Sequence, residues 1–257
     1  MIMSMMQKMK ILSQFCLDLM YPNRCPCCDI HIKWNEFLCE KCKNVILIED
    51  GILCPFCGKS HNDCICNEDD MKYDEAIVLS WYEEEAKKGI IEAKLSENCN
   101  FMKYAGYEIG KRILENEQWN MADAIVPVPM SKNDFLLRGV NPAECIAREI
   151  SSVTHIPLYK NWLKKKNGGQ KQHMLSRDER AENVKQFYTE KHNLNGYTVI
   201  LCDDILTTGS TMNRCAELLK SNGVKTVIAA LAATTKRKEN EIWQQQILES
   251  TSEQLKQ

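Results

Sequence analysis

The stretch that decides the fold is Val199-Ile-Leu-Cys-Asp-Asp-Ile-Leu-Thr-Thr-Gly-Ser-Thr211. Its first four residues are apolar and predict a buried strand. Two adjacent carboxylates, Asp203 and Asp204, follow at the carboxyl end of that strand, and apolar periodicity predicts a helix from Thr211 to about Ser221. A strand, a polar turn and a helix in this order indicate an open α/β fold, which binds ligands at the carboxyl ends of its strands.

The turn between the strand and the helix has the chemistry of a phosphate site. A helix N-terminus presents unpaired N–H groups and a partial positive charge. Gly209 allows the backbone to approach a ligand closely, and hydroxyls that can donate to phosphate oxygens stand at Thr207, Thr208, Ser210 and Thr211. Aspartates at this edge suit ribose hydroxyls or a hydrated Mg²⁺. The spacing differs from the P-loop and from the dinucleotide-binding fingerprint.

The remaining periodicity predicts strands and helices in alternation. We expect strands at 76–81, 122–128, 199–202 and 224–233, and helices at 84–95, 101–117, 142–153 and from 211 onward. This order favours a parallel sheet within one α/β domain spanning 72–235. Asn141 is a suitable N-cap for the third helix. We expect an N-terminal helix at 1–21 and a charged C-terminal helix at 236–257.

The cysteines of residues 22–68 predict a small zinc-ribbon domain before the α/β domain. Two C-x₂-C pairs ten residues apart are typical of a tetrahedral zinc site, formed here by Cys25, Cys28, Cys39 and Cys42. A second set comprises Cys54, Cys57, Cys64 and Cys66, although the C-x-C spacing is tight and His61 is an alternative ligand. We expect one or two structural zinc ions that stabilise this domain.

Composition and charge narrow the class of protein. The 257 residues are 44% hydrophobic and 26% charged, as in a globular protein, and the net charge of −2 excludes a globally basic nucleic-acid binder. No apolar run reaches the ~20 residues of a membrane helix, so we expect no integral membrane segment. Fourteen cysteines without an export signal favour a reducing, cytoplasmic location.

Two further segments bear on the candidate site. The first, residues 126–141, continues from a strand end as a loop that carries Lys132, Arg138 and Gly139 and suits a pyrophosphate. The alternative is a surface loop stiffened by its prolines. The second, 164–187, is basic and glycine-hinged. We interpret it as a mobile lid over an anionic substrate, or else as a disordered basic loop. Its candidate contacts are Gln172, Arg177 and Arg180.

The 199–211 stretch resembles the phosphoribosyl-pyrophosphate (PRPP) signature of type I phosphoribosyltransferases, since Asp-Asp, two apolar residues and Thr-Thr-Gly-x-Thr all match. Nearly the whole chain resembles the ComF family of competence-associated proteins. The matching segments are the entry to the ribbon at 17–25, the loop at 127–141 and the flexible loop at 172–187. Val140, Pro142 and the C-x-C spacing depart from that pattern. The resemblance implies that Asp203 and Asp204 hold ribose hydroxyls and that residues 207–211 grip the 5′-phosphate.

Two function hypotheses follow. In the first, the protein transfers a phosphoribosyl group from PRPP to an unknown acceptor, with Mg²⁺ stabilising the leaving pyrophosphate. In the second, it is a non-catalytic accessory protein of the DNA-uptake machinery, and the basic segment beside Trp162 binds single-stranded DNA. A PRPP-sensing regulator is disfavoured because no helix-turn-helix precedes the α/β domain. The sequence contains no signal that identifies the acceptor.

Overall fold

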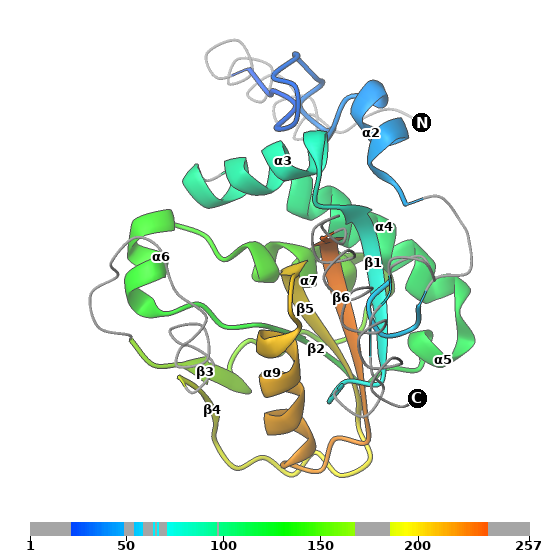
Figure 1. The fold of residues 1–257 in the computed structure, drawn as a ribbon, viewed down its shortest axis with the longest axis vertical. Helices are drawn as coiled ribbons and strands as arrows, with labels where there is room; N and C mark the ends of the chain where they lie inside the picture. The colour runs from blue at the N-terminus through cyan, green and yellow to red at the C-terminus, as the bar shows by residue number, and fades with distance from the viewer. Residues whose placement is uncertain are drawn as a thin grey trace, which may run out of the picture.

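A computed structural model of the chain describes residues 22–48, 54–58, 64, 66, 71–96, 98–167 and 186–235. Its centre is a four-stranded sheet in the order β1-β6-β5-β2, with every neighbouring pair parallel (Figure 1). The strands are Glu75–Trp81 (β1), Ala124–Pro127 (β2), Thr198–Leu206 (β5) and Thr226–Thr234 (β6). The prediction of a parallel α/β sheet is therefore confirmed.

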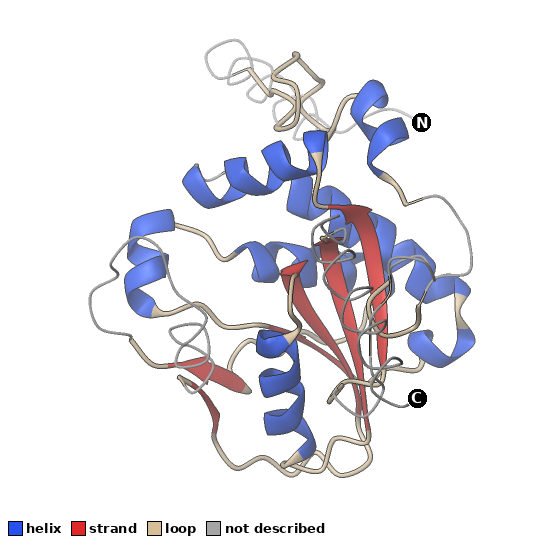
Figure 2. Ribbon diagram, in the orientation of Figure 1, coloured by secondary structure: helices blue, strands red, loops and turns tan. Residues whose placement is uncertain are grey.

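The sheet separates two buried cores because alternate residues of each strand face opposite sides. On β5, Ile200 and Cys202 face the core that contains α4 (Asn100–Glu115) and α7 (Pro142–Thr154). Val199 and Leu201 face the other core, which contains α9 (Ser210–Lys220). Figure 2 shows the red strands between the blue helices. Burial on both faces explains the continuous apolar runs of these strands.

Two of the predicted helices begin at the residue that the sequence indicated. The helix expected at 84–95 is α3 (Glu84–Leu95), and α7 begins after Asn141, whose side chain accepts a hydrogen bond from the Ala143 N–H at 3.1 Å. Five elements were not predicted, and β5 continues four residues beyond its predicted end. The unpredicted elements are α2 (Glu40–Ile46), α5 (Glu117–Asn120), α6 (Lys132–Arg138) and the antiparallel pair β3 (Leu163–Lys165) and β4 (Phe187–Thr189).

The N-terminal cysteine-rich segment packs directly on the α/β core. Leu38 and Ile46 are buried in the same apolar cluster as Ile90 of α3 and Phe101 of α4. These apolar side chains of the cysteine-rich segment thus join the main core. The segment and the helices α3 and α4 therefore share one source of stabilisation.

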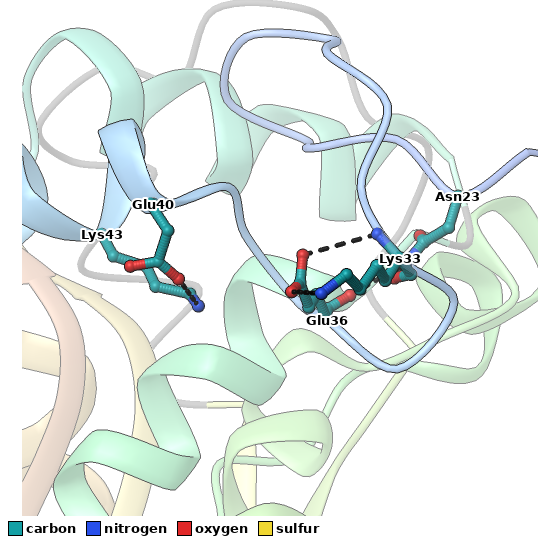
Figure 3. A network of polar contacts seen from close by, with 5 residues as sticks. All are labelled: Asn23, Lys33, Glu36, Glu40 and Lys43. Carbon is teal, nitrogen blue, oxygen red and sulfur yellow. Dashed lines mark hydrogen bonds and ion pairs between the residues drawn. The ribbon is translucent and has the colours of Figure 1, made fainter.

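Polar contacts fix the path of the same segment (Figure 3). The Asn23 side-chain amide donates to the carbonyl oxygens of Lys33 and Glu36, both at 2.9 Å, and accepts from the Asn100 side chain of α4 at 2.9 Å. Lys43 pairs with Glu40 at 2.6 Å on the surface of α2. The Asn23 contacts tie the loop to the helix, whereas the exposed ion pair contributes little.

The helices expected at 1–21 and 236–257 lie outside the described residues. Within the part of the chain that the structure describes, no helix has both the length and the apolar character that crossing a bilayer requires.

Candidate functional site

The site is built on the strand, turn and helix from which the sequence analysis began. Strand β5 ends at Leu206 and α9 begins at Ser210, with Gly209 as the N-cap residue. Gly209 has a φ of 75°, in the left-handed region that glycine adopts without strain. Gly209 has no side chain that could cap this helix end, and unpaired N–H groups of a helix start suit an anionic ligand.

Hydroxyl groups surround this helix end as predicted. Thr207, Thr208 and Ser210 are exposed, and the Thr208 and Ser210 hydroxyls lie 2.9 Å apart. Thr211 is partly buried and lines a cavity beside β5. Hydroxyls and backbone N–H groups at a helix start are the donors that anion-binding turns use.

The two acids lie within the last residues of β5, and both are partly buried. Asp203 Oδ1 accepts a hydrogen bond from the Asp204 N–H at 2.9 Å, and Asp204 Oδ1 accepts one from the Ile205 N–H at 2.8 Å. Burial, and next the charge of Asp204, raise the pKa of Asp203 to about 8. At neutral pH Asp203 is therefore mostly protonated.

A lysine that the sequence analysis missed completes the acid pair. Lys94 of α3 places Nζ 2.6 Å from Asp204 Oδ2. Figure 1 shows α3, α6 and α9 around the carboxyl end of β5. The sequence gives no sign of this contact, because Lys94 lies 110 positions before Asp204 and only the packing of α3 brings them together.

A cavity of about 250 Å³ joins the separate parts of the site. Asp203, Asp204 and Thr211 line it from β5 and α9, and Arg138 lines it from the end of α6. Lys165 of β3 and Phe187 of β4 close another side, with the Lys165 ammonium 4.9 Å from the centre of the Phe187 ring. The cavity thus brings the acidic strand end, the hydroxyl turn and cationic side chains into one space.

The segment expected to be a pyrophosphate loop is largely helical, and that prediction was wrong in its conformation. Residues 132–138 form α6 because Ser131 caps the helix, accepting a hydrogen bond from the Asp134 N–H at 3.1 Å. Gly139 ends the helix in the left-handed conformation, with a φ of 75°. Arg138 lines the cavity, whereas Lys132 is not among the described lining residues and donates its backbone N–H to Asn167.

The flexible-loop contacts predicted at Gln172, Arg177 and Arg180 lie outside the described residues.

Both predicted cysteine sets come together in space. Within each set, all sulfur atoms lie within 4.8 Å of one another. The first set is Cys25, Cys28, Cys39 and Cys42, and the second is Cys54, Cys57, Cys64 and Cys66. A tetrahedral zinc with bonds of about 2.3 Å places its sulfur ligands about 3.8 Å apart. The Cys28–Cys39 and Cys57–Cys64 sulfur distances are 3.6 and 3.7 Å, so the geometry fits zinc. The alternative ligand His61 lies outside the described residues.

The second cluster is bound tightly to the sheet. The Gly58 N–H donates to the Cys54 carbonyl at 2.9 Å, and a Cβ atom on Gly58 would lie 2.5 Å from Val78 Cγ2 of β1. The Tyr73 hydroxyl donates to the Phe56 carbonyl at 2.7 Å. Four thiols in each set fill a tetrahedral shell, which favours a structural role for a bound ion.

Comparison with known proteins agrees with the fold and the site. Residues 108–254 match the model of the phosphoribosyl transferase domain, and the chain belongs to that family. The match includes the acid pair, the hydroxyl turn and Arg138.

Relatives that match over most of their length support an assignment to the ComF family. It is 26% identical to competence protein F of Haemophilus influenzae over 75% of this chain and 94% of that protein. It is 24% identical to the DNA utilization protein YhgH of Escherichia coli K12, over 81% and 96%. It is 23% identical to competence protein ComFC of Bacillus subtilis, over 75% and 81%. The family predicted from the sequence is thereby confirmed.

Proposed function

We propose that the cavity binds PRPP and that the protein transfers its 5-phosphoribosyl group to an unknown acceptor during the handling of incoming DNA in the cytoplasm. The observation that carries this proposal is the shared cavity of Asp203, Asp204, Thr211 and Arg138. Relatives named as competence and DNA utilization proteins support the biological setting.

Each part of the ligand has a chemically suitable partner. The turn from Thr207 to Thr211 offers hydroxyls and the N–H groups of α9 to the 5′-phosphate. The acid pair offers oxygen atoms to the two ribose hydroxyls. Arg138 offers a planar, always charged guanidinium group to the pyrophosphate, and Lys165 adds a second cation on another side of the cavity.

The acids fit ribose hydroxyls better than a directly bound divalent cation. Asp204 already contacts the Lys94 ammonium, and Asp203 holds a proton near neutral pH. We propose that these two acids hold a hydrated Mg²⁺ through water. When bound, Mg²⁺ neutralises charge on the departing pyrophosphate. The side chains then contribute by orienting the ribose and stabilising separated charge.

Turnover is tested by incubating the protein with radiolabelled PRPP and Mg²⁺, with and without single-stranded DNA and a panel of nucleobases. Release of pyrophosphate that requires one acceptor and is lost in Asp203→Asn/Asp204→Asn supports a transferase. Saturable PRPP binding without pyrophosphate release under any condition refutes the transfer step and leaves a ligand-binding role.

A second candidate function, binding of single-stranded DNA, has its own observation. The rings of Tyr159 and Trp162 stack with their centres 4.3 Å apart, and Tyr159 is 40% exposed. On the adjoining β3–β4 pair, Tyr188 is exposed and lies beside the Lys166 ammonium, 5.9 Å from its ring centre. Exposed aromatic rings among lysines suit stacked bases and a phosphate backbone.

This second candidate is tested with fluorescent oligonucleotides. If the surface binds DNA, Tyr159→Ala together with Tyr188→Ala weakens binding of every sequence by about 1–3 kcal/mol per lost stacking contact. The matched control is Tyr107→Ala, which removes an exposed tyrosine of α4. Equal DNA affinity in all three proteins contradicts a DNA site on this surface.

We also propose that each cysteine cluster holds one structural zinc ion. The support is the sulfur geometry and the closed four-thiol sets. Elemental analysis of protein purified without chelators should find two zinc ions per chain, and a value near zero contradicts the proposal.

A further inference from the structure

The contact between Lys94 and Asp204 is less exposed than comparable ion pairs of the described residues. The Lys94 and Asp204 side chains are 29% and 19% exposed, compared with 37% and 25% for Lys160 and Glu144 and 34% and 63% for Lys164 and Glu190. Water and salt screen a partly buried pair less than an exposed one. The 2.6 Å contact adjoins the cavity through Asp204, which is one of its lining residues.

A well-packed helix, and not a loop, holds Lys94 at this place. The preceding residue, Ala93, and Ile90 one turn earlier have no exposed surface. Gly89 brings α3 close to α4, since a Cβ atom on Gly89 would lie 2.7 Å from the Phe101 ring. The backbone position of Lys94 is therefore fixed by the core before any ligand arrives.

The charge of the cavity explains why a fixed cation is useful there. Asp203 interacts electrostatically with Asp204 and the Cys202 thiol on its own strand, with Lys94 of α3 and with the Cys215 thiol of α9. Asp134, Arg138 and Lys165 line the same cavity from other elements. A polyanionic ligand must approach this acid pair. The nearest cation reduces the electrostatic repulsion between the pair and the ligand.

We propose that Lys94 is a positioning residue of the phosphoribosyl site, which orients the Asp204 carboxylate toward the ribose hydroxyls and offsets its charge against an anionic ligand. This inference rests on the proposed function. With Lys94 in this role, the acids need no directly bound metal ion, because the Lys94 ammonium already occupies the cation position on Asp204.

The first test is calorimetry with ribose 5-phosphate and with PRPP, using Lys94→Met, Lys94→Arg and the control Lys87→Met. Lys87 lies two helical turns earlier on α3, is exposed and does not line the cavity. Loss of one charged contact predicts about tenfold weaker binding of both ligands in Lys94→Met. Lys94→Arg should recover most of the affinity, and Lys87→Met should match the wild type.

The second test needs no ligand and separates positioning from general structural damage. The Asp203 carboxyl is followed by ¹³C NMR as a function of pH in the wild type and in Lys94→Met. The positive charge of Lys94 favours the ionised form of Asp203, so its removal should raise the pKa of that carboxyl. Thermal melting of both proteins checks that the variant remains folded.

The outcomes are distinguishable. If Lys94→Met melts like the wild type, binds both ligands equally well and leaves the Asp203 titration unchanged, Lys94 has no positioning role, while the proposed function stands. If the wild type binds neither ligand, the proposed function fails and the ribose-orienting role fails with it. The titration then still decides whether Lys94 sets the charge of the acid pair.

Discussion

Replacing Asp203 by Asn should stabilise the ligand-free protein, and the effect should grow with pH. The pKa of Asp203 rises from 3.8 to about 8 on folding, so the folded state binds a proton more tightly than the unfolded state. Ionisable Asp203 therefore lowers the free energy of unfolding progressively as pH rises from about 4 to about 8. Asn cannot ionise and removes that loss.

The magnitude follows from the size of the shift. A shift of about four pKa units corresponds to a ceiling of about 6 kcal/mol, at about 1.4 kcal/mol per unit. Asp203 keeps some surface exposed to solvent, so we expect a smaller gain in the free energy of unfolding, about 2–4 kcal/mol at pH 8. At pH 5 the gain should be about 1 kcal/mol, because little of the loss has yet developed.

Urea unfolding of the wild type and Asp203→Asn at pH 5 and pH 8 measures this difference directly. Asp204→Asn is the matched control, and it should be destabilised because it leaves Lys94 without its partner. A gain in Asp203→Asn that is equal at the two pH values, or a loss at pH 8, would refute the assignment of a raised pKa to this acid.

Three further predictions follow from the same structure. Gly209→Ala should lower the free energy of unfolding by about 1–2 kcal/mol in a denaturant titration, because alanine is strained at the left-handed φ of this position. Crowding does not contribute, since the atom nearest to an added Cβ is 3.8 Å away. A change in the free energy of unfolding below about 0.3 kcal/mol would contradict this prediction. Arg138→Ala should weaken pyrophosphate binding about tenfold and leave ribose 5-phosphate binding unchanged by calorimetry; equal losses would place Arg138 elsewhere on the ligand. Removing zinc with a chelator should lower the melting temperature of the whole described core in one transition, since Cys42 and Ile90 share an apolar cluster; a separate early transition would show independent modules.

The elements with clear periodicity were predictable from the sequence. The four sheet strands and α3, α7 and α9 follow apolar patterns that depend only on which residues are buried. Asn141 marks a helix start through its side-chain hydrogen bond, so its role is also visible in the chain. Gly209 was predicted only to let a ligand approach, and its place as the N-cap of α9 comes from the structure.

The missed elements lack such patterns. Strands β3 and β4 are three residues long and pair across residues 166–186, so neither has a readable alternation. Helix α6 follows Pro127 and Pro129 and precedes Gly139, which favoured a loop, although the Ser131 and Asp134 capping pair was a signal for a helix.

The site was predictable in its motif and not in its electrostatics. Asp203, Asp204 and the hydroxyl turn are contiguous in sequence, so their proximity needed no tertiary information. The contact of Asp204 with Lys94 depends on how α3 packs, and the raised pKa of Asp203 depends on burial. Neither property is encoded in residue spacing.

The most direct test of the account is calorimetric titration of PRPP with Mg²⁺ into the wild type and into Asp203→Asn/Asp204→Asn, with melting temperatures to confirm folding. The account predicts saturable binding at one site per chain in the wild type and loss of about 100-fold or more in affinity when both acids that contact the ribose are replaced. Equal PRPP affinity in the two folded proteins would contradict the claim that this cavity is a phosphoribosyl site.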